Sequence, residues 1–266
     1  MDSSEPLLRK VEPNTACTSS AVFAVFVLVT LTNPHAAFGS LARNAAGARN
    51  MGESGTYVLD SAVQFEKGDE ERAWAAELGL QIQLTDRFQL LVEAVPFLSE
   101  DPDGESAVRG LGDTELTASF LVLPDDEETY APSLVLGAKA KLPTAGSDLG
   151  TGKPDYSGLL ILGKEFELLD LEAEFEYATF GSPSGVSLDD QFLYSLSADY
   201  SVSDLLSVFA EVSGNSAPTA DESRSDVGTF GFELDVAQTE SATTYVTLEF
   251  DTESTATARV GFELAW

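Results

Sequence analysis

The sequence is almost without cysteine and histidine. Its 266 residues include one of each, Cys17 and His35, and both lie near the N-terminus. If that region is removed as a leader, the mature chain has no disulfide, no metal site of cysteines and histidines, and no histidine general base. Paired carboxylates could act on glycosides, but with this many acids some adjacent pairs are expected by chance. We therefore predict that the protein is not an enzyme, with no catalytic residue, no metal site and no cofactor.

Basic residues and long apolar runs are also scarce. Lysine and arginine number 14 against 45 aspartates and glutamates, so the formal net charge is −31. Proteins that bind nucleic acid or anionic lipid electrostatically carry basic patches, so this balance argues against both partners. No apolar run reaches the ~20 residues that a membrane-spanning helix needs. Acidic charge alone is also typical of solubility or of adaptation to a salty medium.

The N-terminal residues are typical of a secretory signal peptide. Arg9 and Lys10 precede an apolar run at residues 21–31, which is too short to span a membrane and disfavours an uncleaved anchor. Small residues follow, so we predict that residues 1–39 are cleaved off before Ser40. Cys17 precedes the apolar run and is misplaced for a lipoprotein anchor. Residues 40–54 are expected to form a flexible lead-in facing the periplasm.

From residue 55 onward, apolar and polar residues alternate with a period of two, as in strands with one apolar face. The clearest case is residues 169–177, where five apolar or aromatic residues alternate with four acidic ones. We count about twelve such segments of about ten residues, the length of a tilted strand that crosses a bilayer. The fold class is therefore all-β, with residues 55–266 as a transmembrane up-and-down antiparallel β-barrel. A soluble β-sandwich is the alternative, and it would dissolve without detergent.

The connections between these segments alternate in length. Longer polar loops are expected at residues 98–111, 143–155, 180–189 and 214–226, and short turns near Asp86, Phe166, Ser203 and Gln238. Bacterial outer-membrane barrels have long loops outside and short turns in the periplasm. An even number of strands would place both ends of the barrel in the periplasm. We predict export through the signal peptide to the outer membrane of a Gram-negative cell.

The last strand resembles the terminal strand of outer-membrane β-barrels, which the barrel-assembly machinery recognises as an insertion signal. Its apolar face ends on an aromatic residue at the chain terminus. The resemblance implies two partners, outer-membrane lipid and the barrel-assembly machinery. The residues of the predicted signal are Ala258, Val260, Phe262, Leu264 and Trp266.

The opposite faces of the strands should line a lumen that is mostly acidic. Isolated buried carboxylates are costly, so this interior should hold water and counter-ions, or many of its acids should be protonated. We expect a channel or transporter for small solutes, with a lumen that prefers cations; the solute itself is not identified by the sequence. The alternative is a plugged structural or ligand-binding barrel without conductance. The predicted lumen-facing residues are Glu77, Glu93, Glu115, Lys139, Lys141, Asp170, Glu172, Glu174, Glu176, Asp199, Glu211, Glu233, Glu249, Arg259 and Glu263.

Short motifs in the middle third of the chain resemble one family of outer-membrane barrels. They are the segment at residues 110–116 (GLGDTEL), the segment at 139–144 (KAKLPT), the GTG loop at 150–152, and Asp155-Tyr156. Ala145 stands where the family often has glycine. The family comprises transporters associated with the meta-cleavage (MetA) pathway of phenol degradation. The resemblance implies an outer-membrane channel or transport protein and brings no catalytic residues.

Overall fold

The computed structural model describes residues 51, 53–69, 71–102, 104, 106–126, 130–147, 149–182, 188–216, 225–239 and 241–266. The predicted signal peptide and most of the predicted lead-in lie outside these residues. Among the described residues, no helix is long and apolar enough to cross a membrane. The strands are β1 (Tyr57–Lys67), β2 (Glu71–Thr85), β3 (Phe88–Pro102), β4 (Val108–Gly110), β5 (Thr114–Leu123), β6 (Ser133–Leu142), β7 (Asp155–Glu165), β8 (Leu169–Thr179), β9 (Gln191–Ser203), β10 (Leu206–Asn215), β11 (Ser225–Gln238), β12 (Ala242–Asp251) and β13 (Ala256–Ala265).

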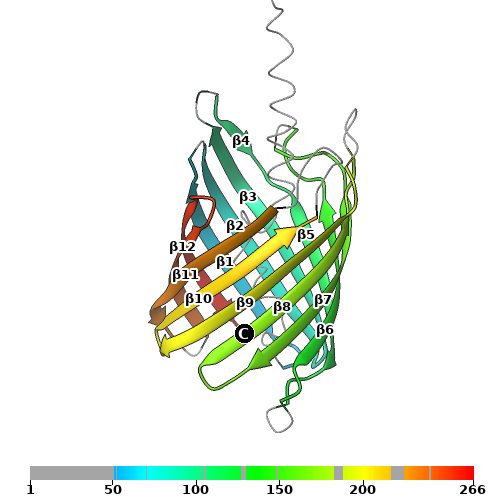
Figure 1. Ribbon diagram of the computed structural model, residues 1–266, viewed down its shortest axis with the longest axis vertical. Coiled ribbons are helices and arrows are strands. Elements are labelled where there is room, and N and C mark those ends of the chain that lie inside the picture. Colours follow the sequence, from blue (N-terminus) through cyan, green and yellow to red (C-terminus); the bar gives the residue numbers. More distant parts are fainter. Residues whose placement is uncertain are drawn as a thin grey trace, which may run out of the picture.

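Twelve of the thirteen strands form a closed antiparallel barrel (Figure 1). Each strand of the barrel pairs with the next barrel strand along the chain, β3 with β5 in place of β4, and the barrel closes where β1 pairs with β13. The two ends of the barrel domain meet at this seam. The Tyr57 N–H donates to the Trp266 carbonyl and the Trp266 N–H donates to the Tyr57 carbonyl, each at 3.0 Å. The predicted fold class and the count of about twelve strands are confirmed.

The expected loop at residues 98–111 is in fact partly β-strand, because it contains the end of β3 and the whole of β4. β3 continues to Pro102, and the three residues of β4 pair with the end of β3 as a short hairpin. β4 is not one of the twelve strands that close the barrel. The alternation that predicts strands needs more residues than β4 contains. This hairpin therefore could not be recognised from the sequence pattern.

The connections divide the barrel into two ends, which we call the long-loop rim and the short-turn rim. The long-loop rim carries β4 and the connections after β6, β8 and β10, whereas Tyr57 and Trp266 lie at the short-turn rim. The expected asymmetry holds only in part. The long-loop rim also has two short connections, 68–70 and 252–255, and the short-turn rim has a nine-residue connection at 124–132.

The connection at 124–132 is tied to the neighbouring strand by a charged contact. The Lys164 ammonium lies 2.7 Å from Asp125 Oδ1, and the Glu165 N–H donates to Asp125 Oδ2 at 3.2 Å. Burial alone would raise the pKa of Asp125, but these contacts and the Asp126 N–H together lower it. The carboxylate therefore stays ionised and fixes the longest connection of the short-turn rim against β7.

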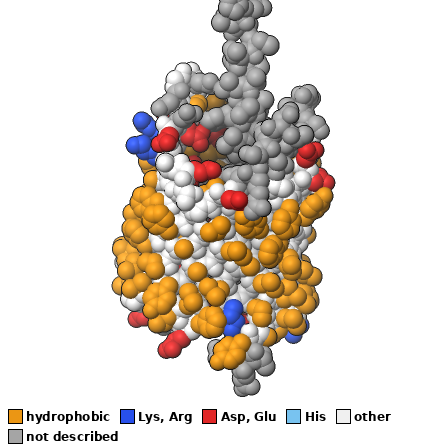
Figure 2. Space-filling model, in the orientation of Figure 1, with side chains coloured by type: hydrophobic (Ala, Val, Ile, Leu, Met, Phe, Trp, Pro, Cys, Tyr) orange, Lys and Arg blue, Asp and Glu red, His pale blue; other side chains and the backbone are white. Residues whose placement is uncertain are grey.

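Exposed apolar side chains occur on every strand of the barrel, and in the face that Figure 2 shows they form a broad band between the two ends. On β8, Leu171 is 41% exposed and Tyr177 is 54% exposed, whereas Glu176 on the opposite face is 5% exposed. Acidic and basic side chains in this view lie toward the two ends of the barrel. Apolar side chains exposed in a band, with polar ones inside, reverse the arrangement of a soluble domain and require contact with hydrocarbon. The soluble β-sandwich is thereby excluded.

A polar network covers the closing seam on the lumen side. Tyr245 on β12 reaches across Gly261 on β13, and its hydroxyl donates to Asp60 on β1 at 2.8 Å. Arg259 lies beside it, with Nη2 3.5 Å from Asp60 Oδ1 and 3.1 Å from Glu77 Oε2. A Cβ added at Gly261 would lie 2.2 Å from Tyr245 Cζ. Glycine is therefore required at position 261 so that the tyrosine ring can lie flat across the strand.

We expect Gly261→Ala to lower the free energy of unfolding by about 1–3 kcal/mol, since the new methyl group displaces Tyr245 from Asp60. Gly158→Ala is the matched control, because a Cβ there would meet nothing within 4 Å. Urea unfolding in lipid vesicles measures both. In a Tyr245→Ala background, the cost of Gly261→Ala should fall to that of the control. An equal cost in both backgrounds would contradict the proposed contact.

Candidate functional site

The predicted lumen residues are charged side chains with little exposure. Most belong to the face opposite the apolar band, and five of them are buried: Glu77, Glu93, Glu176, Glu211 and Arg259. Nine are partly exposed: Glu115, Lys139, Lys141, Asp170, Glu172, Glu174, Asp199, Glu233 and Glu249. Glu263 is exposed and lies close to the short-turn rim. Their role in pore electrostatics stays a prediction.

The three predicted basic residues pair with acids of the interior. Lys139 Nζ lies 3.1 Å from Glu176 Oε2, and Arg259 bridges Glu77 and Asp60. Lys141 Nζ is paired with Asp155 and lies 3.4 Å from Asp113 Oδ2. These pairs neutralise only part of the acidic charge, because acids outnumber bases on the inner face.

The strand register places carboxylates directly opposite one another. Glu93 on β3 is the partner of Glu115 on β5, and Asp170 on β8 is the partner of Asp199 on β9. Like charges in directly opposed positions of neighbouring strands repel one another. Glu93 is 4% exposed, and its Oε1 has no hydrogen-bond partner among the described residues. Water or cations next to these pairs would relieve the repulsion, and so would a proton held by one acid of each pair.

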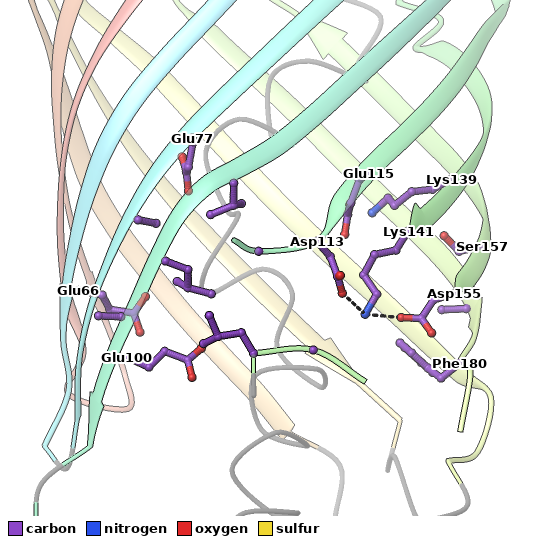
Figure 3. A pocket seen from close by; sticks show the side chains of 18 of the residues that line it. Glu66, Glu77, Glu100, Asp113, Glu115, Lys139, Lys141, Asp155, Ser157 and Phe180 are labelled. Atoms are coloured by element: carbon purple, nitrogen blue, oxygen red, sulfur yellow. Dashed lines mark ion pairs between the residues drawn. The ribbon is translucent and has the colours of Figure 1, made fainter. Parts of the chain in front are cut away.

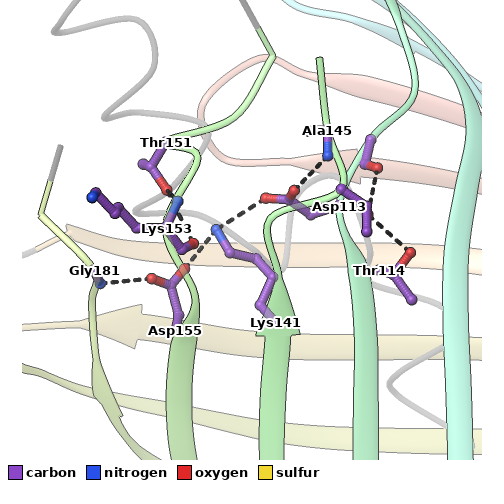
Figure 4. Close-up of polar contacts among 10 residues, drawn as sticks. Asp113, Thr114, Lys141, Ala145, Thr151, Lys153, Asp155 and Gly181 are labelled. Carbon is purple, nitrogen blue, oxygen red and sulfur yellow. Dashed lines mark hydrogen bonds and ion pairs between the residues drawn. The ribbon is translucent and has the colours of Figure 1, made fainter. Parts of the chain in front are cut away.

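The motifs of the middle third meet at the long-loop rim (Figure 4). Lys141 lies between Asp113 and Asp155. Each aspartate also fastens a loop: Asp113 accepts the Ala145 N–H and Asp155 accepts the Gly181 N–H, both at 2.8 Å. We call this group of five residues the loop latch. It holds the connections after β6 and β8 against the ends of β5 and β7.

The glycines of the same motifs allow close packing beside the loop latch. A Cβ at Gly112 would lie 2.7 Å from Val95 Cβ, and a Cβ at Gly150 would lie 2.8 Å from Ala145 Cβ. The Gly112 N–H donates to the Val95 carbonyl at 2.9 Å. The GLGD and GTG motifs are thus packing and loop-fixing elements of the rim.

Several residues of the inner face were absent from the predicted set. Asp60, Asp113, Asp155 and Tyr245 make the contacts described above, and buried amides add to them: Gln64, Gln83, Gln89, Gln191 and Asn215. Asp60, Gln64 and Tyr245 could have been found, since each alternates with outward apolar residues of its own strand. The Asn215 amide donates to Gln191 at 3.1 Å, so neutral pairs also line the interior.

Part of the inner face is apolar, which the alternation did not predict. Leu121, Val135 and Ile161 of β5, β6 and β7 form a buried cluster near the short-turn rim, and Met51 packs against it. These three strands lie three, four and five positions from β1 around the barrel. Met51 therefore lies on a different part of the wall from Tyr57, whereas Ser54 and Gly55 are hydrogen-bonded to Leu84 and Gln83 at the end of β2.

A cavity of about 150 Å³ lies in the interior toward the long-loop rim (Figure 3). Glu66 and Glu100 lie on one side of it, and the Lys141 group with Asp113 and Asp155 lies on the other. Apolar side chains, among them Val95, Leu149 and Leu193, complete the lining. Among the described ranges, no three acidic, cysteine or histidine side chains converge to hold a metal ion.

The predicted insertion signal lies on the outer surface of β13. Val260 is 55% exposed, Phe262 is 42% exposed and Trp266 is 60% exposed, while Ala258 and Leu264 are partly exposed. The Trp266 ring stacks on Tyr57, with ring centroids 5.9 Å apart. An aromatic pair at the short-turn rim is the arrangement of an interfacial girdle.

Three solved structures that share the fold are described as an outer-membrane channel and two porins. An outer-membrane channel from Pseudomonas putida F1 superposes with a TM-score of 0.66 at 16% identity, over 84% of this chain and 98% of that chain. The NanC porin has a TM-score of 0.57 at 13% identity, over 77% and 98%. The KdgM porin, solved in complex with disordered oligogalacturonate, has a TM-score of 0.52 at 13% identity, over 78% and 98%. None of these three is an enzyme by its description.

The sequence comparisons agree with the predicted family. No curated protein matches the chain. The family described as "Putative MetA-pathway of phenol degradation" matches residues 42–262. With its apolar outer band and barrel fold, the protein is an outer-membrane β-barrel, and the chain belongs to this family.

Proposed function

We propose that the protein is an outer-membrane channel whose acidic lumen passes small solutes and prefers cations. The observation that carries the proposal is the direct opposition of Glu93 and Glu115 on neighbouring strands of the inner face. Their repulsion is relieved when water and cations occupy the space beside them. A lumen that holds water and cations beside Glu93 and Glu115 is also able to conduct cations.

The cation preference is tested by reversal potentials of the refolded barrel in a planar bilayer under a salt gradient. We expect cation permeability to exceed anion permeability, and the ratio to fall about threefold or more in the Glu93→Gln/Glu115→Gln variant. Glu167→Gln is the control, since this residue is exposed in the turn between β7 and β8. An anion-selective wild-type channel would refute the proposal.

The family description and the mixed interior support organic solutes. An apolar cluster of Leu121, Val135 and Ile161 faces the same interior as the carboxylates. A passage with both kinds of wall suits small molecules that have an apolar body and a polar group. The association of the family with phenol degradation is consistent with such solutes.

A plugged barrel without conductance is the second candidate, and the packing of Met51 inside the short-turn rim supports it. Discrete current steps in a bilayer would favour the channel, and their absence would favour the plugged barrel.

The proposal also covers how the protein reaches the outer membrane. Residues 1–39 would direct export, the long-loop rim would face outward, and the barrel-assembly machinery would recognise β13. The exposed apolar face of β13 and the terminal Trp266 support this last step.

A further inference from the structure

The cavity near the long-loop rim has two chemically different sides. Glu66 of β1 and Glu100 of β3 line one side, and both are only partly exposed. Figure 3 shows them across the cavity from Asp113 and Asp155. The register explains their placement: Glu66 is the partner of Ala73, and Ala73 is the partner of Glu100. The small alanine between them leaves room into which both carboxylates can project.

A third carboxylate on this side has unused hydrogen-bonding capacity. Glu77 lines the cavity and is 3% exposed. Its Oε2 is paired with Arg259, but its Oε1 has no hydrogen-bond partner among the described residues. A buried carboxylate oxygen without a donor is costly, so a donor group entering the cavity would be stabilised there.

The two lysines that line the cavity form ion pairs with acids other than Glu66, Glu77 and Glu100. Lys139 is paired with Glu176, and Lys141 is held between the two aspartates of the loop latch. These contacts fix both ammonium groups on the far side of the cavity (Figure 3). Arg72 also lines the cavity but is exposed, and Arg259 is paired with Glu77, so the charge on this side comes mainly from Glu66 and Glu100 and is negative.

The rest of the lining is apolar and its size is limited. Val95, Leu98, Leu149, Phe180 and Leu193 contribute carbon surface. The volume of about 150 Å³ equals that of an apolar cavity known to accommodate one benzene molecule. A hydrated inorganic ion would leave this carbon surface without a partner, whereas a single ring would cover it.

We propose that this cavity binds a small organic cation: a protonated amine on an apolar body about the size of one ring. The ammonium group donates to the carboxylates of Glu66 and Glu100, with the open oxygen of Glu77 on the same side of the cavity, and the ring packs against the leucines and Phe180. The inference deepens the proposed channel function by naming a solute class for the entrance of the lumen. It rests on that function only for its biological role, because binding is measurable without conduction.

The test uses three ligands of similar shape and different charge: benzylamine, benzyl alcohol and benzoate. Isothermal titration calorimetry of the refolded barrel, corrected with protein-free detergent micelles, should show saturable benzylamine binding at neutral pH. We expect benzyl alcohol to bind about tenfold more weakly and benzoate not to bind. Equal or tighter binding of benzyl alcohol or benzoate would overturn the proposal.

A double variant tests the contribution of the carboxylates separately from that of the apolar lining. Glu66→Gln/Glu100→Gln should weaken benzylamine binding about tenfold and leave benzyl alcohol binding unchanged. The control Asp170→Asn/Glu263→Gln removes two carboxylates near the short-turn rim and should have no effect. Heat-modifiable mobility on gels verifies that each variant is folded. Unchanged benzylamine affinity in the folded Glu66/Glu100 variant would also overturn the proposal.

The outcomes keep this site distinct from the channel proposal. If the barrel conducts no current but binds benzylamine selectively, the site stands and the channel fails. If it conducts cations but binds the three ligands alike, the channel stands and the site fails.

Discussion

Replacing Arg259 with leucine should lower the free energy of unfolding by about 3–5 kcal/mol, since removing one partner of a buried ion pair leaves the other charge unpaired. Arg259 is 3% exposed and lies within ion-pair distance of both Glu77 and Asp60. Its guanidinium also lies 5.6 Å from the centre of the Tyr245 ring. One substitution therefore removes contacts among β1, β2, β12 and β13 at the seam that closes the barrel.

Urea unfolding in lipid vesicles, followed by tryptophan fluorescence, measures this effect. Arg87→Leu is the matched control, because Arg87 is exposed in the turn between β2 and β3. The triple variant Arg259→Leu/Glu77→Leu/Asp60→Leu should recover part of the loss, since it removes the stranded charges together with their partner. A cost below about 1 kcal/mol for Arg259→Leu would show that water already solvates these acids and that the pairs contribute little.

Removing the chain before Thr56 should raise the single-channel conductance roughly threefold, because it removes Met51 from the apolar cluster inside the short-turn rim. Met51 packs on the cluster of Leu121, Val135 and Ile161, several strands away from the start of β1. Ser54, three residues later, is hydrogen-bonded to Leu84 at the end of β2.

Planar-bilayer recordings compare the truncated and full mature chains. Met51→Asp is the informative point variant: a carboxylate is poorly accommodated by the apolar cluster, so the segment should detach and conductance should rise in the same direction. Glu53→Gln is the control, because Glu53 is exposed. Equal conductance in the full, truncated and Met51→Asp chains would show that the lead-in does not limit the passage.

The orientation of side chains was predictable from the sequence because it depends only on the local pleat of each strand. Leu171 and Glu172 are neighbours in the chain and must point to opposite faces, whatever the rest of the barrel does. The outward band on β8 and β13 follows from this rule. The count of about twelve strands follows too, since each segment long enough to cross the bilayer shows its own alternation.

The partners across strands were not predictable. Tyr245 and Asp60 are separated by 185 positions, and their contact depends on the register of three strands. Bulges shift that register, between Ala76 and Leu78 on β2 for example, and no pattern in the sequence marks them. The apolar cluster at the short-turn rim was also missed, because the apolar residues that break the alternation are few in each strand: Leu121 on β5, Val135 on β6, and Leu159 and Ile161 on β7.

The polar network over the seam links the first and the last strand of the barrel. It can therefore form only after the last strand has joined the barrel. β1 is made early and β13 last, so Asp60 cannot meet Tyr245 and Arg259 until the whole chain has been delivered. Closing so large a loop carries the greatest entropic cost of any pairing in the molecule. The contacts across Gly261 therefore stabilise only the closed barrel. They give no stability to a barrel that lacks β13.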